Sequence, residues 1–188
     1  KAQNKDNLVF GVVDQSNIPF ADYPFAKQIR YVRIDPIHAR GPCWARALAQ
    51  SLMSDETYFL QIDSHTVFGE GWDIFLIKNL ERLQQVHAKP LISHYPLGFK
   101  LLDYDAAAFE VVGEYPDGIN PMRVKSDELL SAEYTVAQHG VMTESVDPQH
   151  GFLLGGGFIF ARSAWVQEVP YDPHFYFHGE EQALMLRT

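Results

Sequence analysis

Asp63 and His65 stand two residues apart at the end of an apolar and aromatic run that begins at Tyr58. In a strand their side chains would point to the same side, because side chains alternate along a strand. A carboxylate oxygen and an imidazole nitrogen together suit a divalent metal such as Mn²⁺, with open positions left for substrate oxygens. The alternative interpretation is that Asp63 caps the following turn and His65 is a surface residue.

The elements that must position this pair read as alternating strands and helices. Strands are predicted where short β-branched or aromatic runs end at Asp or Pro, in residues 8–13, 29–34, 58–62 and 91–95. Helices are predicted where apolar residues recur at helical spacing, in residues 39–54 and 72–87. This order indicates an α/β fold with a mostly parallel central sheet flanked by helices. Ligands of such sheets bind outside the carboxyl ends of the strands, where Asp35 and Asp63 both fall.

Length and charge narrow the range of functions. The chain has 188 residues, 46% of them hydrophobic, which predicts one domain over residues 1–188. Its formal net charge of -9 argues against non-specific nucleic-acid binding, which depends on neutralising many phosphates. Cys43 is the only cysteine, so we expect no disulfide framework and a cytoplasmic setting. No apolar run approaches the roughly 18 residues that would cross a bilayer.

Two segments of the second half depart from regular patterns. The stretch from Asp103 to Gln149 has no sustained period, and a long irregular insertion in a compact domain is more often functional than idle. Gly155, Gly156 and Gly157 interrupt an apolar run that otherwise reads as a strand. Either a bulge or the close approach of a ligand to the backbone would explain them.

A resemblance to known enzymes is carried by the stretch FLQIDSHTVFGEGWD. It resembles the metal-binding strand end of glycosyltransferases with the GT-A (nucleotide-diphospho-sugar transferase) fold, in the Asp-Ser-His form of their Asp-x-Asp motif. That form is found in polypeptide GalNAc-transferases and in the UDP-GlcNAc transferases that modify hydroxyproline on a cytoplasmic ubiquitin-ligase subunit. The second family is the closer one. Four segments resemble it in the same order: ARGPCWARALAQSL, LQIDSHTVFGEGWD, GFLLGGGFIFARSAW and FYFHGEEQALMLR.

The resemblance implies a metal and donor site. Asp63 and His65 would be ligands of Mn²⁺ or another divalent metal, with Ser64 between them in the donor site. A further histidine ligand of the GalNAc-transferases would fall beyond Thr188, so we expect the catalytic domain to continue past that residue. The glycines at 155–157 border the donor sugar in the resembled family.

Charged residues elsewhere complete the expected site. Arg46 matches an arginine on the equivalent helix, and Arg40 is a second candidate for pairing with phosphate near the start of that helix. Asp35 could hydrogen-bond the uridine or could be a turn residue before Pro36. Glu180 and Glu181 fall in a segment that resembles the Gly-Glu segment of the GalNAc-transferases, where the carboxylate helps to hold donor sugar and acceptor. Glu180 is the better match, and Glu181 replaces an amide found there. Acidic residues in a first helical turn are also favoured by the helix dipole.

These features predict a metal-dependent transferase. It would move a sugar, GlcNAc by resemblance, from a UDP-sugar to a hydroxyl group on a protein or glycan, with retention of configuration. One alternative is a catalytically silent carbohydrate- or nucleotide-binding protein on the same fold. Another is a metal-dependent hydrolase, although the histidines do not fall in paired metal-ligand spacings such as H-E-x-x-H.

Overall fold

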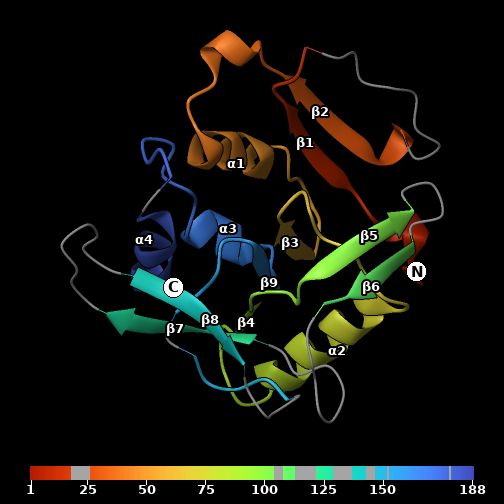
Figure 1. Ribbon diagram of the computed structural model, residues 1–188, viewed down its shortest axis with the longest axis vertical. Coiled ribbons are helices and arrows are strands. Elements are labelled where there is room, and N and C mark those ends of the chain that lie inside the picture. The colour runs from red at the N-terminus through yellow and green to blue at the C-terminus, as the bar shows by residue number, and fades with distance from the viewer. Residues whose placement is uncertain are drawn as a thin grey trace. The chain divides into compact units, whose positions relative to one another are not determined.

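Short strands and helices follow one another along the computed structural model of the protein (Figure 1). The structure describes residues 1–17, 26–103, 108–112, 122–128, 137–142, 147–151, 153–177 and 179–188. The strands in these ranges are β1 (Phe10–Asp14), β2 (Ile29–Arg33), β3 (Tyr58–Ile62), β4 (Leu91–Ser93), β5 (Phe99–Asp103), β6 (Ala108–Val111), β7 (Met122–Glu128), β8 (Ala137–Met142) and β9 (Phe158–Arg162). The helices are α1 (Pro42–Ser51), α2 (Trp72–Gln84), α3 (Ala164–Glu168) and α4 (Glu180–Arg187), and short 3-10 helices lie at Lys5–Asn7, Ala26–Gln28 and Pro36–His38.

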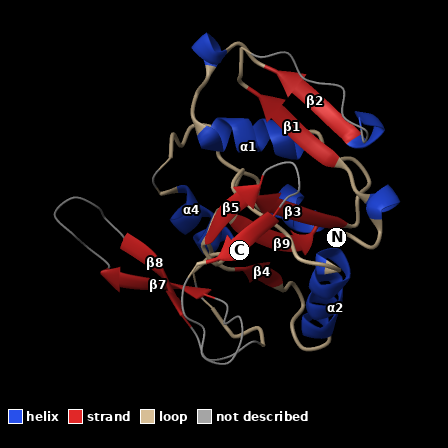
Figure 2. Cartoon of the chain, turned by 45° about the vertical axis from the view of Figure 1, so that its right-hand side comes forward, coloured by secondary structure: helices blue, strands red, loops and turns tan. Residues whose placement is uncertain are grey.

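The described strands form four small sheets, as the cartoon in Figure 2 shows. β1 and β2 are parallel, whereas β5 pairs with β6 and β7 pairs with β8 in the antiparallel sense. β3, β9 and β4 form a sheet in that order. The mixed α/β class predicted from the sequence is therefore confirmed. The single, mostly parallel central sheet is not what these strands form, because neighbouring strands can pair directly as antiparallel ribbons without a crossover helix.

The direction of β9 follows from two backbone hydrogen bonds. The Asp63 amide, just after β3, donates to the Gly157 carbonyl, just before β9, at 3.1 Å. At the other end, the Ser163 amide after β9 donates to the Thr57 carbonyl before β3, also at 3.1 Å. The end of each strand thus lies beside the start of the other, so β3 and β9 are antiparallel. This pairing brings the end of β3 next to Gly155, Gly156 and Gly157, which form the glycine segment before β9.

Helix α1 begins and packs as its sequence indicates. Pro42 occupies its first turn, where a missing amide hydrogen costs nothing. Gly41 precedes it with φ 92°, and a Cβ there would lie 2.6 Å from the Tyr176 carbonyl oxygen. Toward β1, a Cβ on Gly11 would meet the Ala49 carbonyl oxygen at 3.1 Å, so this helix and strand pack closely.

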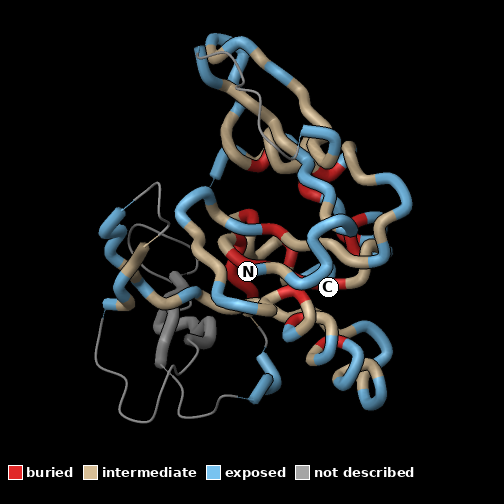
Figure 3. Tube along the Cα trace, turned by 90° about the vertical axis from the view of Figure 1, so that its right-hand side faces the viewer, coloured by how far each residue is buried: buried red, intermediate tan, exposed pale blue. Residues whose placement is uncertain are grey.

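The chain divides into two compact units. The first comprises residues 1–59, 67–91 and 161–188, and the second comprises residues 60–66 and 92–160. The first has a core that includes Cys43, Leu76, Leu80, Ala161, Trp165, Val166, Val169, Tyr171 and Leu184. Among the described residues of the second, Leu154, Phe158, Ile159 and Phe160 are buried apolar residues, the last three of them on β9. Figure 3 colours the chain by burial. A single catalytic domain over residues 1–188 stays a prediction.

Two predictions about the second half of the chain need correction. The stretch from Asp103 to Gln149 is not wholly irregular, because its described parts include β6, β7 and β8. Its turn-rich composition hid short antiparallel strands, and residues 104–107, 113–121, 129–136 and 143–146 lie outside the description. The three glycines do not interrupt β9 but precede it, since the strand begins at Phe158. None of the described helices is long and apolar enough to cross a membrane.

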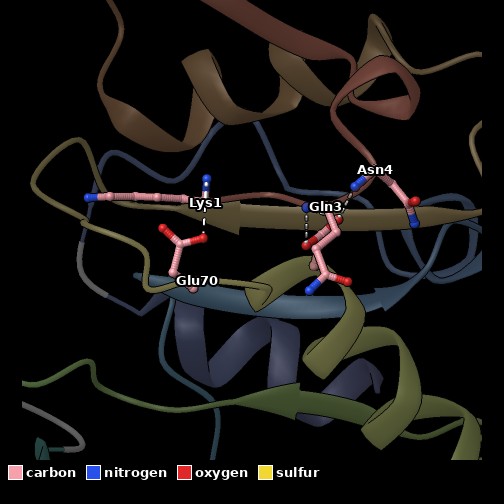
Figure 4. A network of polar contacts seen from close by, with 5 residues as sticks. Lys1, Gln3, Asn4 and Glu70 are labelled. Carbon is pink, nitrogen blue, oxygen red and sulfur yellow. Dashed lines mark hydrogen bonds and ion pairs between the residues drawn. The ribbon is translucent and has the colours of Figure 1, made fainter.

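The buried Asp73, in the first turn of α2, anchors the N-terminal segment. Its carboxylate accepts hydrogen bonds from the Gln3 amide at 3.0 and 3.1 Å and from the Asn4 amide at 2.7 Å. Figure 4 shows Gln3 and Asn4 in this network, and Lys1 facing Glu70 nearby. Burial by itself would raise the pKa of Asp73. Hydrogen bonds from backbone amides, the strongest of them from Asn4, outweigh this effect and hold the pKa below its ordinary value.

The variant Asp73→Asn tests this anchor. It is expected to lower the free energy of unfolding by about 1 to 3 kcal/mol at neutral pH, because a neutral amide replaces a charged acceptor of backbone hydrogen bonds. Since the folded-state pKa is depressed, the stabilisation is present above the unfolded-state pKa of about 4. It is lost as the pH falls through the folded-state value. Urea unfolding of both proteins from pH 7 to about pH 2.5 measures this difference.

Glu70→Gln is the matched control, because the Glu70 side chain is 86% exposed. Its effect should stay below about 1 kcal/mol. A cost of Asp73→Asn that stayed constant down to the lowest pH would contradict the account.

Candidate functional site

The tip of β3 brings Asp63 and His65 together through a turn. β3 ends at Ile62, and Ser64 and His65 lie in a turn rather than in a continued strand. The sequence analysis placed the two side chains on the same side of a continued strand, and this reason for their proximity was wrong. The turn nevertheless places Nε2 of His65 3.8 Å from Oδ2 of Asp63. Both groups are accessible, because the Asp63 side chain is 38% exposed and the His65 side chain 82% exposed.

These two atoms are close enough for one divalent cation to reach both. An ion with bonds of about 2.1 Å to oxygen and nitrogen can touch two atoms separated by up to about 4.2 Å. The observed separation of 3.8 Å lies within that reach. Among the described residues, no group of three or more His, Cys, Asp or Glu side chains could hold a metal ion. A cation at this tip would therefore take only two ligands from these residues and the rest from substrate or water.

Each glycine of the segment before β9 makes its own contact. The Gly155 amide donates to Oγ of Ser93 at 2.8 Å. The Gly156 carbonyl accepts from Nε2 of Gln61 at 2.5 Å. Gly157 accepts from the Asp63 amide and lies against the Asp63 carboxylate, where a Cβ would come within 2.7 Å of Oδ2. The close approach expected at these glycines thus involves the protein's own side chains, and their contact with a donor sugar stays a prediction.

A second cluster joins α1 to the start of α4. Nη1 of Arg46 lies 3.8 Å from Oε1 of Glu180 and 3.3 Å from the hydroxyl of Tyr171. Its guanidinium also faces the Tyr171 ring, 5.6 Å from the centroid. Glu180 is buried, although it begins a helix. Burying a carboxylate is costly unless it is paired, and the half-buried Arg46 supplies the positive charge for this pair.

The same face of α1 carries two further buried groups. Oε1 of Gln50 accepts a hydrogen bond from the Tyr171 amide at 3.1 Å. Cys43 is fully buried, and the pKa of its thiol is raised to about 11. The main cause is desolvation, and the negative charge of Glu180 is the second. At physiological pH this thiol is therefore protonated and a poor nucleophile.

Two of the expected donor-binding residues have local partners instead. The Asp35 carboxylate accepts from the Ile37 amide at 3.0 Å and caps the 3-10 helix at Pro36–His38. The turn role that the sequence allowed is therefore present, and the uridine contact stays a prediction. The Arg40 guanidinium lies over the Trp44 ring, 5.7 Å from its centroid, in an exposed position.

Ser64 and Glu181 are the remaining expected residues. Ser64 is exposed in the turn between the two metal-ligand candidates. Glu181 is half-buried in the first turn of α4, where the helix dipole favours it. The sequence analysis missed Tyr171 and Gln50. Arg46 and Gln50 follow Cys43 by three and seven residues, a spacing that puts all three on one face of a helix. This spacing was the signal in the sequence that could have identified Gln50.

A family model matches most of the chain. The model of the family described as "Glycosyltransferase (GlcNAc)" matches residues 6–188 of the chain. This range includes the tip of β3, the glycine segment and the cluster at α1 and α4. No curated protein and no solved structure matches the chain.

The variant Arg46→Met tests the buried pair. It is expected to lower the free energy of unfolding by about 2 to 4 kcal/mol, because it leaves the buried Glu180 carboxylate without this cation. Arg40→Met is the matched control, and its exposed contact with Trp44 should be worth about 1 kcal/mol or less. The double variant Arg46→Met, Glu180→Gln should cost less than the sum of its two single changes. Additive costs in denaturant unfolding would show that the two side chains are not coupled.

Cys43 provides a test of burial on the same helix face. With a pKa of about 11, only about 0.1% of the thiol is ionised at pH 8, against roughly a quarter of an ordinary cysteine. Alkylation by iodoacetamide in the native protein should therefore be at least about 100-fold slower than in the urea-unfolded protein, as followed by mass spectrometry. Equal rates in the two states would show that this face of α1 is open.

Proposed function

The chain belongs to the glycosyltransferase (GlcNAc) family, and from this premise we propose that it transfers N-acetylglucosamine from a UDP-sugar to a hydroxyl group of a protein or glycan. The observation that carries the proposal is the pair Asp63–His65, an oxygen and a nitrogen ligand 3.8 Å apart at an accessible strand tip. The resemblance of the surrounding segment to the Asp-Ser-His form of the GT-A metal motif supports the UDP-sugar and the GT-A fold.

The metal pair would serve the diphosphate of the donor. Asp63 and His65 would hold Mn²⁺ or a similar divalent cation, and Ser64 would lie beside the bound donor. When bound, such a cation neutralises the negative charge that grows on the diphosphate as the sugar leaves. The exposure of both side chains supports this role, because substrate oxygens need access to the remaining coordination positions.

The cluster around Glu180 would act on the sugar side of the reaction. The support is the resemblance of this segment to the Gly-Glu segment of the polypeptide GalNAc-transferases, where the carboxylate helps to hold donor sugar and acceptor. Arg46 is engaged by Glu180 and Tyr171, so we assign it first to orienting that carboxylate rather than to binding phosphate directly. Glu181, Arg40 and Asp35 stay candidates for secondary contacts to donor or acceptor.

The transfer would retain the anomeric configuration. The bond between the anomeric carbon and the diphosphate oxygen breaks, and the acceptor hydroxyl oxygen forms the new bond from the same face. The hydroxyl proton passes to the departing diphosphate. The support for retention is the resemblance to the hydroxyproline GlcNAc-transferases and the polypeptide GalNAc-transferases.

A binding protein without catalytic activity is the second candidate. It is favoured by one observation: among the described residues the metal pair is not joined by a third protein ligand. Such a protein would bind UDP or a sugar but would not turn over a donor.

Donor turnover separates the two candidates. We expect UDP release from UDP-GlcNAc in the presence of Mn²⁺ and little release without it, measured over a panel of UDP-sugars with the full-length protein. Asp63→Asn should lower the Mn²⁺-dependent rate by at least about 100-fold, since it removes the charged metal ligand. The matched control is Asp55→Asn, an exposed carboxylate before β3, which should leave the rate unchanged.

Each outcome has a defined meaning. Release from a different UDP-sugar would retain the transferase and change its donor. Metal-independent release that Asp63→Asn does not alter would overturn the metal site. UDP binding without release from any donor would establish the binding protein instead.

A further inference from the structure

Gly157 leaves room for the Asp63 carboxylate. A Cβ built on Gly157 would lie 2.7 Å from Oδ2, 3.2 Å from Cγ and 3.7 Å from Oδ1 of Asp63. Side-chain carbons do not approach oxygen as closely as 2.7 Å without a shift of one of the two groups. Any residue other than glycine at this position would therefore compete with the observed place of the carboxylate.

The backbone conformation gives no other reason for glycine here. Among the described glycines, only Gly41, Gly71 and Gly179 have a positive φ. Gly157 is not among them, so its φ does not by itself require glycine. The requirement at Gly157 is therefore one of space, and the three atoms nearest to an added Cβ all belong to the Asp63 side chain.

The oxygen that an added Cβ would displace, Oδ2 of Asp63, is also the one nearest to His65. Oδ2 of Asp63 would be nearest to the added Cβ, and the same Oδ2 lies 3.8 Å from Nε2 of His65. The main chain cannot separate easily at this point, because the Asp63 amide donates to the Gly157 carbonyl at 3.1 Å. Relief would come from rotation of the short Asp63 side chain, which moves Oδ2 away from its place beside His65.

We infer that Gly157 is a positioning residue of the metal site, which sets the direction of the Asp63 carboxylate by lacking a side chain. This inference rests on the proposed function, because it gives Asp63 and His65 a shared cation. It assigns a distinct role to one glycine of the segment: Gly157 supports the ligand from behind rather than only bordering a substrate.

The neighbouring Gly155 supplies a contrast. A Cβ on Gly155 would meet the Tyr95 ring at 3.4 Å, an ordinary contact distance, and no atom of Asp63 is among its nearest neighbours. Gly155 also has no positive φ. Alanine at 155 thus adds the same methyl group two residues away, without touching the metal ligand.

The test is Mn²⁺ affinity in Gly157→Ala, titrated with MnCl₂ in the presence of UDP and followed by electron paramagnetic resonance of the free ion. We expect a 10- to 100-fold weaker affinity than in the unaltered full-length protein, the range found when groups that orient metal ligands are changed. Turnover of UDP-GlcNAc should recover when Mn²⁺ is raised, so that the Mn²⁺ requirement shifts more than the maximal rate. The thermal unfolding midpoint should fall by only a few degrees, because a side-chain rotation relieves the clash.

Two further variants make the test specific. Gly155→Ala should keep the Mn²⁺ affinity within about twofold, since its methyl group does not reach Asp63. In an Asp63→Asn background, Gly157→Ala should cause little additional loss of Mn²⁺ affinity, because the oriented ligand is already gone. A purely structural role of Gly157 would instead produce the same loss in both backgrounds.

The possible failures are distinguishable. Unaltered protein that binds no Mn²⁺ with UDP overturns the proposed metal site and this inference together. Unaltered protein that binds Mn²⁺, with Gly157→Ala binding equally well, overturns the inference alone. Equal losses in Gly155→Ala and Gly157→Ala, or failure of Gly157→Ala to fold, would also overturn it by showing a general packing requirement of the segment.

Discussion

The contact between the end of β3 and the start of β9 is the constraint on which the candidate metal site depends. One backbone hydrogen bond from Asp63 to Gly157 fixes the two main chains side by side. Given that fixed approach, the absence of a side chain on Gly157 decides where the Asp63 carboxylate can lie. The turn at Ser64 and His65 then completes the pair of candidate ligands. A small sheet thereby orients a charged group that is itself accessible to solvent.

In the second cluster, one helix packs on one face and makes polar contacts on another. Toward β1, α1 presents the backbone around Ala49 to a glycine, which permits close packing. On another face, Cys43, Arg46 and Gln50 contact or influence the segment that carries Tyr171 and Glu180. The ion pair of Glu180 with Arg46 and the hydrogen bond to Oε1 of Gln50 offset part of the cost of burying polar groups there, while Nε2 of Gln50 is buried without a hydrogen-bond partner among the described residues. Asp73 is a similar case, because hydrogen bonds from the Gln3 and Asn4 amides offset the cost of burying its carboxylate.

Several local features could be read from the sequence because they depend on neighbours along the chain. Pro42 and the apolar spacing located α1, the aromatic run located β3, and the acidic pair at 180–181 located the start of α4. Asp63 and His65 were found because ligand types stand close together in sequence. The strands within 103–149 were not found, because their pairing rather than their composition defines them.

The sequence by itself thus determined which residues are candidate metal ligands and where most helices and strands of the candidate site begin. Tertiary structure alone decided which groups meet. Gln61 bonds to Gly156 across 95 residues, and Arg46 bonds to Tyr171 across 125. Local periodicity carries no information about partners at such separations, because they are selected by strand pairing and by the burial of whole faces. For that reason the sequence could mark the glycine segment as unusual, while only the fold showed that Gly157 faces a carboxylate.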